Sequence, residues 1–532
     1  MLRVAKNLAF PYPATIFTAH HPGPARRSRT FPDHLMHHYG QDKLTPARAL
    51  ALTRGTLKAT IPAAVQHSVN TARAAVEQMA AGTRPVYGIN TGFGPLCDTR
   101  ISPEDTSRLQ RNLLLSHAVG VGEPVSPDIV RLMMVSKVHA LSQGHSGIRL
   151  AVIERILEFL AKGLTPEVPS QGSVGASGDL APLAHLFLPL IGEGHFWDGE
   201  TRSPAADVLA ENGLEPLQLA AKEGLALING TQFILAHAVA GLDRMRYLLG
   251  LADLAGAMSL EGYQGSAAPF RAELHTLRPF AGSIEVAARI RSFLAGSENM
   301  QSHAACSRVQ DPYSLRCMPQ VHGASRNAHH HLSELVEIEL NAVTDNPVLI
   351  DADTAVSGGN FHGQPLALAL DYCSLAAAEL GNIADRRCYL LLEGKYGLPR
   401  LLTAAGGLNS GFMIPQYTTA ALVTENKSLC FPPSADSVPT SLGQEDHVSM
   451  GSISGRRFNQ VLGNLEKIFA IELLYAAQAM DFRRPLTFSP VLEENHALIR
   501  QHVAHLDDDR LLKPDIDAMV ALVRGRRLNT TA

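Results

Sequence analysis

Hydrophobic residues recur at helical spacing along most of the chain from about residue 41 onward. A helix start is predicted at Ser126, a capping side chain followed by Pro127 and Asp128, which both favour a first helical turn. A second helix is predicted over 148–162, where apolar residues repeat every four positions and Gly163 then ends the pattern.

Long apolar-striped segments extend this pattern at 217–262, 364–394 and 447–481, whereas the alternating pattern of strands is scarce. We therefore predict a mainly α fold, with a core bundle of long helices and a smaller N-terminal domain. The predicted divisions are a tail over 1–40, an N-terminal domain over 41–235 and the long-helix bundle over 236–532.

Composition narrows the class of protein. Charged residues make up 18% of the 532 residues, below the roughly 25% usual for globular domains, which suggests surface hidden in subunit contacts. A net charge of -4 gives no reason to expect a nucleic-acid partner. No apolar run approaches the ~18 residues of a membrane helix, so no membrane partner is expected.

The six cysteines include no CxxC pair, which argues against a zinc knot. Reduced thiols and a cytoplasmic location are expected. Residues 1–32 contain no Asp or Glu but carry Arg and Lys, a composition faintly similar to a transit peptide. Four prolines between residues 11 and 24 oppose the amphipathic helix of such peptides, so we predict a disordered tail.

Glycine-rich polar segments interrupt the predicted helices. Each combines glycine with Tyr, Asn, Gln, Arg or His, and they lie at 86–96, 168–182, 309–323, 357–364 and 434–450. Because loops present polar groups from a rigid frame, these segments suggest a single composite site.

The segment around Ala176-Ser177-Gly178 can supply an electrophile made from the chain itself. In a tight turn, the amide nitrogen of Gly178 can attack the carbonyl carbon of Ala176, since glycine has no Cβ to obstruct the closure. Loss of two waters, one from the Ser177 side chain, leaves a five-membered imidazolone with an exocyclic methylidene. The tripeptide alone is common and is usually a flexible turn before a helix.

The surrounding letters GSVGASGDLAPLAH resemble the signature of the histidine and phenylalanine ammonia-lyase family, and the resemblance spans about 41–525 at five separate motifs. It implies that Ala176, Ser177 and Gly178 form 4-methylidene-imidazol-5-one (MIO) autocatalytically, with no dissociable cofactor and no metal. In such enzymes the substrate amine adds to the methylidene and a base removes a β-proton. The resemblance also implies a homotetramer whose sites gather residues from three subunits.

Family matching supplies further candidate residues. Tyr87, in a glycine-flanked loop, is the candidate base, although a tyrosine with an ordinary pKa near ~10 needs activation. Tyr313 is the second family tyrosine, expected to assist at the MIO group or in proton handling. Arg316 lies one helical turn after it and is the expected clamp for a substrate carboxylate. Asn229 is expected to donate hydrogen bonds near the MIO oxygen or the substrate. Gln310 and Phe361 match further pocket positions.

Two residues bear on the substrate. Ser116-His117 resembles the pair of histidine ammonia-lyases, in which the histidine contacts the substrate imidazole. Glu445 can accept a hydrogen bond from an imidazole but gains nothing from a phenyl ring. The expected reaction is therefore elimination of ammonia from L-histidine to give trans-urocanate. The chain departs from the usual histidine-lyase pattern at three places beside pocket residues, which are Met318, His322 and 442–443.

Other functions remain open from the sequence. A phenylalanine or tyrosine ammonia-lyase, or an aminomutase, would use the same electrophile. A metal enzyme is a second class, given 23 histidines and the run His329-His330-His331, but adjacent histidines on a helix diverge and no HExxH occurs. We expect that run to be a solvated face. A non-catalytic helical scaffold is a third class, which the joint presence of Ser177, Tyr87, Tyr313 and Arg316 disfavours.

Overall fold

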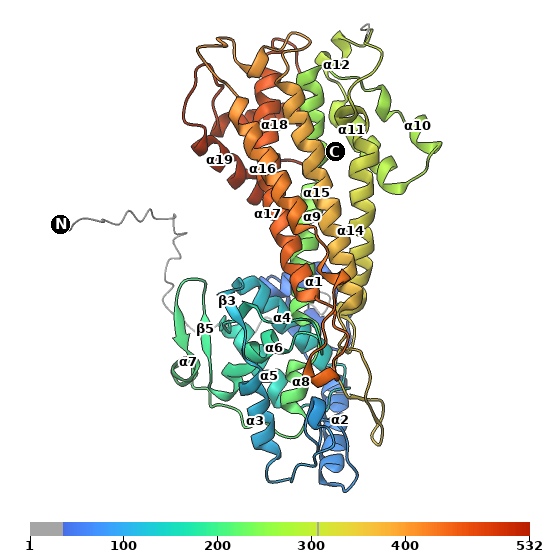
Figure 1. The fold of residues 1–532 in the computed structure, drawn as a ribbon, viewed down its shortest axis with the longest axis vertical. Coiled ribbons are helices and arrows are strands. Elements are labelled where there is room, and N and C mark those ends of the chain that lie inside the picture. Colours follow the sequence, from blue (N-terminus) through green and yellow to red (C-terminus); the bar gives the residue numbers. More distant parts are fainter. Residues whose placement is uncertain (1–35, 306–307, 532) are drawn as a thin grey trace, which may run out of the picture.

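The computed structural model describes residues 36–305 and 308–531. A tall bundle of helices stands on a smaller unit built from the N-terminal part of the chain (Figure 1). Nineteen α-helices and eight short strands occur among the described residues, and the strands form only two-stranded sheets. The prediction of a mainly α fold with a long-helix bundle is confirmed.

The helices of the smaller unit are short to medium in length. They are α1 (Pro46–Thr53), α2 (Ala63–Ala81), α3 (Thr106–His117), α4 (Pro127–Leu141), α5 (Leu150–Lys162), α6 (Leu180–Phe187), α7 (Ala205–Glu211) and α8 (Glu223–Ile228). Its sheets pair β1 (Met36–His38) with β2 (Lys58–Thr60), β3 (Val121–Pro124) with β4 (Pro169–Gln171) and β5 (His195–Trp197) with β6 (Arg202–Pro204). The first pair is parallel and the others are antiparallel.

Four long helices form the bundle, and each packs against others of the set. They are α9 (Gln232–Tyr263), α14 (Met318–Leu340), α15 (Gln364–Leu391) and α17 (Gly451–Asp481). Around them lie α10 (Ala272–Thr276), α11 (Ala281–Leu294), α12 (Glu298–Ser302), α13 (Tyr313–Arg316), α16 (Met413–Leu429), α18 (Pro490–His502) and α19 (Lys513–Arg524). The small antiparallel pair β7 (Val348–Leu349) and β8 (Ala355–Val356) instead packs against the smaller unit, where Leu349 joins a cluster with Ala72 and Val76 of α2.

Local sequence explains where individual helices begin and end. Ser126 precedes Pro127 at the start of α4 as predicted, although its side chain makes no capping hydrogen bond. Gly163 ends α5 with φ of 70°, the left-handed conformation that glycine adopts without a Cβ clash. The helix predicted over 148–162 begins two residues later, because Arg149 is still extended.

The N-terminal division differs from the prediction over a few residues. Residues 36–40 were placed in the tail, but Met36–His38 pairs with β2 and Tyr39 is buried. The remainder of the predicted tail, 1–35, lies outside the described residues, as does Cys306. The boundary at 235/236 falls inside the first turn of α9 and stays a prediction.

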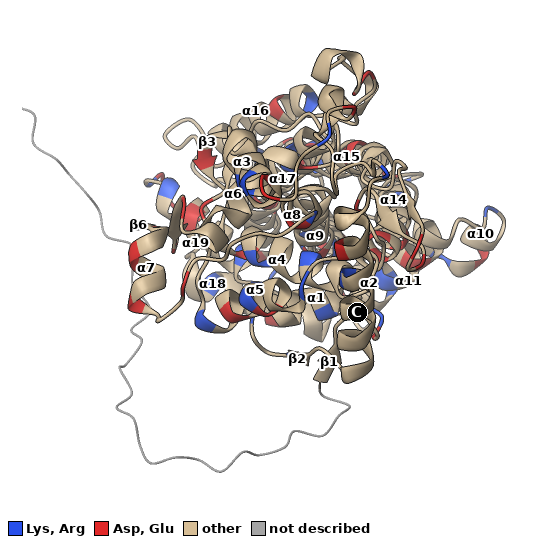
Figure 2. Ribbon diagram, turned by 90° about the horizontal axis from the view of Figure 1, so that it is seen from below, with Lys and Arg blue, Asp and Glu red and all other residues tan. Residues whose placement is uncertain are grey.

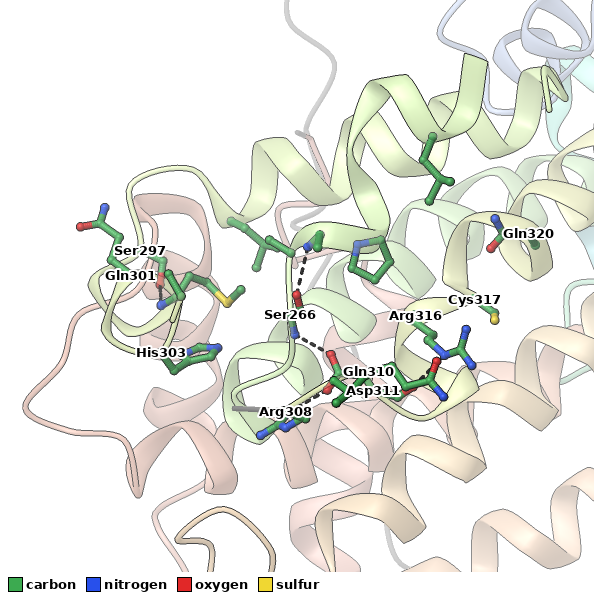
Figure 3. Close-up of a pocket in the computed structure, with 18 of the residues that line it drawn as sticks. Ser266, Ser297, Gln301, His303, Arg308, Gln310, Asp311, Arg316, Cys317 and Gln320 are labelled. Carbon is green, nitrogen blue, oxygen red and sulfur yellow. Dashed lines mark hydrogen bonds and ion pairs between the residues drawn. The ribbon is translucent and has the colours of Figure 1, made fainter. Parts of the chain in front are cut away.

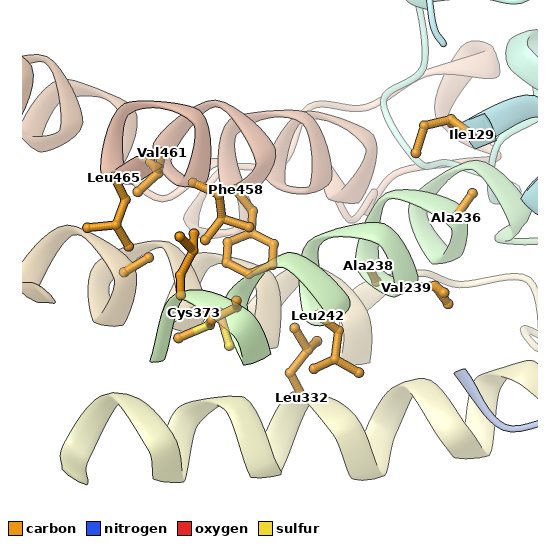
Figure 4. Close-up of a cluster of buried hydrophobic side chains, with 14 of the residues drawn as sticks. Ile129, Ala236, Ala238, Val239, Leu242, Leu332, Cys373, Phe458, Val461 and Leu465 are labelled. Carbon is orange, nitrogen blue, oxygen red and sulfur yellow. The ribbon is translucent and has the colours of Figure 1, made fainter. Parts of the chain in front are cut away.

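The bundle core is apolar and continuous. Phe458, Val461 and Leu465 of α17 meet Leu242 of α9 and Leu332 of α14, all fully or nearly fully buried (Figure 4). Helix α15 is long and apolar enough to cross a membrane by length and composition, although no membrane helix was expected from the sequence. Because 72% of that apolar window is buried inside the protein, α15 is a core helix of the bundle.

Charged residues are also buried in this core. Acidic and basic residues are interspersed along the described chain (Figure 2). His322 is fully buried, and its Nδ1 lies 2.9 Å from Asp253 Oδ1. Met318 is fully buried against Gly256, where an added Cβ would approach the Met318 sulfur to 2.3 Å. These two departures from the histidine-lyase pattern are therefore accommodated in the bundle core.

Candidate active site

A cavity of about 950 Å³ is lined by residues of the smaller unit together with residues of the segments 346–361 and 441–445. Seven segments that are distant in sequence line it. They contribute Tyr87 and its loop, Ser116 and His117, Ser177, Leu225 with Asn229, Asn346, Phe361 and Glu445. Six of the predicted site residues are thus brought to one cavity, and Ala176 and Gly178 flank Ser177 directly.

The turn at 176–178 has the geometry that its chemistry requires. Gly178 has φ of 76°, and a Cβ built on it would come within 2.2 Å of the carbonyl oxygen of Gly230. No residue with a side chain fits there, which meets the requirement for an unobstructed glycine nitrogen. Ala176 is 8% exposed and offers only a methyl group beside the turn. The residues present fit formation of the methylidene-imidazolone.

Asp179 anchors this turn to the bundle. Its backbone N donates to Gly230 O at 2.8 Å, and its Oδ2 accepts from the backbone N of Phe233 and Ile234 at 3.0 and 2.9 Å. Those amides open α9, where the helix dipole favours a carboxylate. Burial raises the pKa of Asp179 to about 7, against the lowering effect of the two amides. The motif contains Asp179, but its anchoring role depends on contacts 54 and 55 positions away.

Glu445 faces Ser177 directly. Ser177 Oγ donates to Glu445 Oε1 at 2.7 Å, across 268 positions of sequence. The other carboxylate oxygen accepts from Thr440 Oγ1 at 3.0 Å and from Ser441 Oγ at 2.8 Å. Thr440 and Ser441 therefore fix the orientation of the carboxylate. Sequence reasoning missed both hydroxyls, and their only signal is their position four and five residues before Glu445.

His117 is the last residue of α3, and one of its two ring nitrogens has a partner within the chain. Its Nδ1 lies 3.0 Å from Ser116 Oγ, so Nε2 is the nitrogen left for another partner. Burial lowers the pKa of His117, which leaves the imidazole neutral at pH 7. A neutral imidazole with one engaged nitrogen can exchange a single directed hydrogen bond with a ligand in the cavity.

Tyr87 lies in a glycine-rich loop that lines the same cavity as His117 and Ser177. Its Oη accepts a hydrogen bond from Gly94 N at 3.3 Å, and burial raises the pKa of the phenol. Tyr87 is therefore a neutral phenol at pH 7 in the isolated chain. Proton abstraction by Tyr87 requires either alkaline pH or a further positive group close to the oxygen.

Asn229 forms the wall behind Ser177. It is 3% exposed, and its Nδ2 donates to Leu225 O and to Asn346 O, both at 3.3 Å. Asn346 in turn accepts from Gly358 N at 2.9 Å, which ties this wall to the loop carrying Phe361. Asn346 was not among the predicted site residues, because no motif in the sequence marks it.

The remaining predicted residues lie elsewhere. Gln310 and Arg316 line a second cavity of about 740 Å³ (Figure 3). Tyr313 is 70% exposed, and the Arg316 guanidinium stacks 4.4 Å from its ring centroid. Arg316 also donates from Nε to Asp311 O at 2.8 Å.

Helix α14 separates the two groups. It starts at Met318, two residues after Arg316, and ends at Leu340, six residues before Asn346 of the first cavity. Its 23 residues span about 35 Å at the usual helical rise. Within one chain, the 309–323 segment therefore lines a different cavity from Ser177. The expectation of a composite site that gathers residues from three subunits stays a prediction.

The histidine run holds no metal cluster. Among the described residues, no group of three or more His, Cys, Asp or Glu side chains is arranged to bind a metal ion. His330 and His331 are exposed, as predicted for a solvated face. His329 differs, because it is half-buried with its Nε2 3.2 Å from Leu242 O.

Residues 44–501 match the family model described as aromatic amino acid lyase. The chain belongs to the aromatic amino acid lyase family. As a member of this family it is 49% identical over 487 residues to the histidine ammonia-lyase of Symbiobacterium thermophilum, covering 91% of this chain and 96% of the relative.

Solved structures of similar proteins have the same fold. The histidine ammonia-lyase of Trypanosoma cruzi superposes with a TM-score of 0.85 at 42% identity, covering 93% of this chain and 94% of that chain. The tyrosine aminomutase of Streptomyces globisporus superposes with a TM-score of 0.86 at 36% identity, covering 92% of this chain and 97% of that chain. This aromatic amino acid lyase therefore resembles structures with two different named activities.

Proposed function

We propose that this aromatic amino acid lyase is a histidine ammonia-lyase, which eliminates ammonia from L-histidine to give trans-urocanate. The observation that carries the proposal is the common placement of Ser177, His117 and Glu445 on one cavity, with Glu445 in hydrogen-bond contact with Ser177. The similarity to named histidine ammonia-lyases over most of both chains supports the same substrate.

The electrophile in this proposal is the methylidene-imidazolone made from Ala176, Ser177 and Gly178. When formed, it supplies an electron-poor carbon that activates the substrate amine as a leaving group. The glycine-only conformation at Gly178 supports its formation. The group is built from the chain, so the proposed enzyme has no dissociable cofactor.

His117 and Glu445 select the substrate in this proposal. His117 Nε2 and a carboxylate oxygen of Glu445 can each engage a nitrogen of a substrate imidazole. Asn229 and Phe361 complete the wall of the pocket. A phenyl ring would offer no partner to His117 Nε2 or to the carboxylate oxygen that faces Ser177, so an imidazole is favoured over it.

Tyr87 acts as the base that takes a β-proton. Three further residues come from neighbouring subunits of a homotetramer. They are the second family tyrosine Tyr313, the carboxylate clamp Arg316 and Gln310. The distance of about 35 Å along α14 supports this division, since the segment cannot serve its own chain's cavity.

Exposed apolar residues support assembly. Leu368, Tyr372 and Leu375 follow one face of α15 at helical spacing and are 55%, 48% and 52% exposed. A stripe of this kind on a bundle helix is typical of a subunit interface. The proposed enzyme is a cytoplasmic protein, in keeping with free thiols at the five described cysteines.

An aminomutase acting on tyrosine is the second candidate, favoured by the superposition on the aminomutase structure. The same fold and electrophile would serve it. The pair His117 and Glu445 favours the imidazole substrate over a phenol.

The decisive experiment incubates the purified protein separately with L-histidine, L-phenylalanine and L-tyrosine and follows the near-ultraviolet absorbance of each unsaturated acid. The Ser177→Ala variant is the control. Absorbance growth with histidine alone, lost in the variant, is expected. Growth only with phenylalanine or tyrosine would overturn the substrate assignment, and β-amino acid formed from tyrosine would favour the aminomutase.

A further inference from the structure

A fully buried lysine stands behind the active-site wall, outside the cavity itself. Lys137, on α4, is 2% exposed, and its Nζ donates a hydrogen bond to the backbone carbonyl oxygen of Asn229. It does not line the cavity that contains Ser177. Lysine is among the residues least often buried, so a position of this kind needs a partner or a task.

The surrounding charges are also buried. Lys222 Nζ lies 2.6 Å from Asp345 Oδ2, with exposures of 0% and 4% for the two side chains. Asp179, behind the turn at 176–178, is fully buried as well. Burial lowers the pKa of Lys137 to about 7, with the neighbouring Asp345 and Asp179 acting in the opposite direction. Charged or neutral, its nitrogen retains N–H donors for the Asn229 carbonyl.

The peptide that Lys137 contacts lies next to the residue that holds the turn at 176–178. The Asn229 carbonyl points to Lys137, whereas the next carbonyl, that of Gly230, accepts the hydrogen bond of Asp179 N at 2.8 Å. The same Gly230 oxygen would lie 2.2 Å from a Cβ on Gly178. Gly230 has φ of 124°, a conformation that favours glycine, so no side chain of its own restrains the peptide planes on either side of it.

We propose that Lys137 is a positioning residue for formation of the electrophile. By holding the Asn229 carbonyl, it fixes the Asn229–Gly230 peptide plane, and the Gly230 carbonyl then presses the turn at 176–178 into the tight conformation needed for ring closure. The inference rests on the proposed function, because it concerns the group formed from Ala176, Ser177 and Gly178.

The covalent step itself uses only atoms of the chain. The Gly178 nitrogen forms a bond to the Ala176 carbonyl carbon, and the carbonyl oxygen leaves as one water with the amide hydrogens of Gly178 and Ser177. The Ala176 carbon is then doubly bonded to the Ser177 nitrogen. The Ser177 hydroxyl and its α-hydrogen leave as the second water. Lys137 takes no part in this balance, since it acts only through the position of the Asn229–Gly230 peptide.

The test is the mass of the proteolytic peptide that contains 168–182, measured together with kcat and KM for histidine. Lys137→Met removes the donor at similar volume, Lys137→Arg retains a donor, and Ser136→Ala is the matched control. The Ser136 hydroxyl is buried on the same helix and bonds only to carbonyls of that helix. Thermal melting of each variant establishes that it is folded.

In the wild type the peptide should lack the mass of two waters in full. In Lys137→Met we expect the dehydrated fraction to fall at least several-fold and kcat to fall in the same proportion, with KM unchanged because the molecules that have cyclised are normal. Lys137→Arg and Ser136→Ala should retain the full deficit. If Lys137→Met does not fold, Lys137→Gln, polar but shorter, should show the same loss.

Complete dehydration of a folded Lys137→Met or Lys137→Gln protein would overturn the inference, whatever its activity. A wild-type peptide of unaltered mass would instead overturn the proposed function. The two failures are therefore distinguishable by the wild-type measurement alone.

Discussion

Ser177 Oγ donates a hydrogen bond of 2.7 Å to Glu445 Oε1, joining a loop of the smaller unit to the segment that precedes α17. Thr440 and Ser441 occupy the other oxygen of the same carboxylate. Once Ser177 loses its hydroxyl in forming the proposed electrophile, Oε1 is the oxygen that becomes free. The carboxylate then offers one oriented acceptor next to the reacting carbon, which suits an imidazole nitrogen better than an apolar ring.

Replacement of Gly178 by Ala should abolish activity with histidine. The added Cβ would lie 2.2 Å from Gly230 O and 3.0 Å from Phe361 O, both backbone atoms that cannot move aside easily. The turn should open and the peptide containing 168–182 should keep both waters. Mass spectrometry of that peptide checks the prediction, and Gly163→Ala, which meets no atom within 4 Å, is the control at another positive-φ glycine.

Replacement of Glu445 by Gln should reduce kcat/KM for histidine by about 10- to 100-fold, the equivalent of about 1.4–2.8 kcal/mol. The amide retains the shape but loses the charge that Thr440 and Ser441 orient. Steady-state kinetics with histidine and phenylalanine provide the measurement. An equal loss for both substrates would argue against a role for Glu445 in selecting the imidazole.

Activity should rise with pH through the neutral to alkaline range. Burial raises the pKa of Tyr87 above its ordinary value, so the phenolate form grows about tenfold for each pH unit below that pKa. A profile of kcat/KM against pH should therefore climb on its acid side. Tyr87→Phe should lose most activity together with this dependence; if the slope persists in the residual activity, another group is responsible.

Asp179 should make the protein less stable as pH rises toward neutrality. Its folded-state pKa of about 7 lies above the unfolded value of about 3.8, so the folded state binds the extra proton between these values. The corresponding stability is complete below pH 3.8 and is lost as pH rises through 7. The free energy of unfolding in urea should be measured for wild type and for Asp179→Asn at pH 5 and pH 8. Relative to the variant, the wild type should be more stable at pH 5 than at pH 8 by a few kcal/mol.

The sequence predicted the parts of the site that lie close together along the chain, and it did so for physical reasons. A glycine-flanked Ala176-Ser177-Gly178 turn and a helix ending at His117 are local features. The roles of Thr440, Ser441 and Lys137 depend on which side chains the folded chain brings together, and no spacing in the sequence encodes that. The separation of Arg316 from Ser177 likewise follows from α14 lying between them as one unbroken helix.

That separation leads to a complementation test of the assembly. Ser177→Ala disables the cavity of its own chain, whereas Arg316→Ala disables the segment offered to a neighbour, so each variant alone should be nearly inactive. If sites combine residues from different subunits, tetramers mixed from the two variants contain some cavities with Ser177 from one chain and Arg316 from another. The mixed tetramers are obtained by co-expression with two different affinity tags followed by sequential purification. Their kcat should reach up to about a quarter of the wild-type value. A site is intact only where the chain that supplies Ser177 and the chain that supplies Arg316 both carry the native residue, and each has a chance of about one half. Activity no greater than that of the parents, in a mixed tetramer verified by mass, would mean that Arg316 does not serve a neighbouring cavity. The same mixing with Ser177→Ala and Tyr87→Phe is the matched control, since both residues lie on one cavity of this chain and their exchange between subunits should restore nothing.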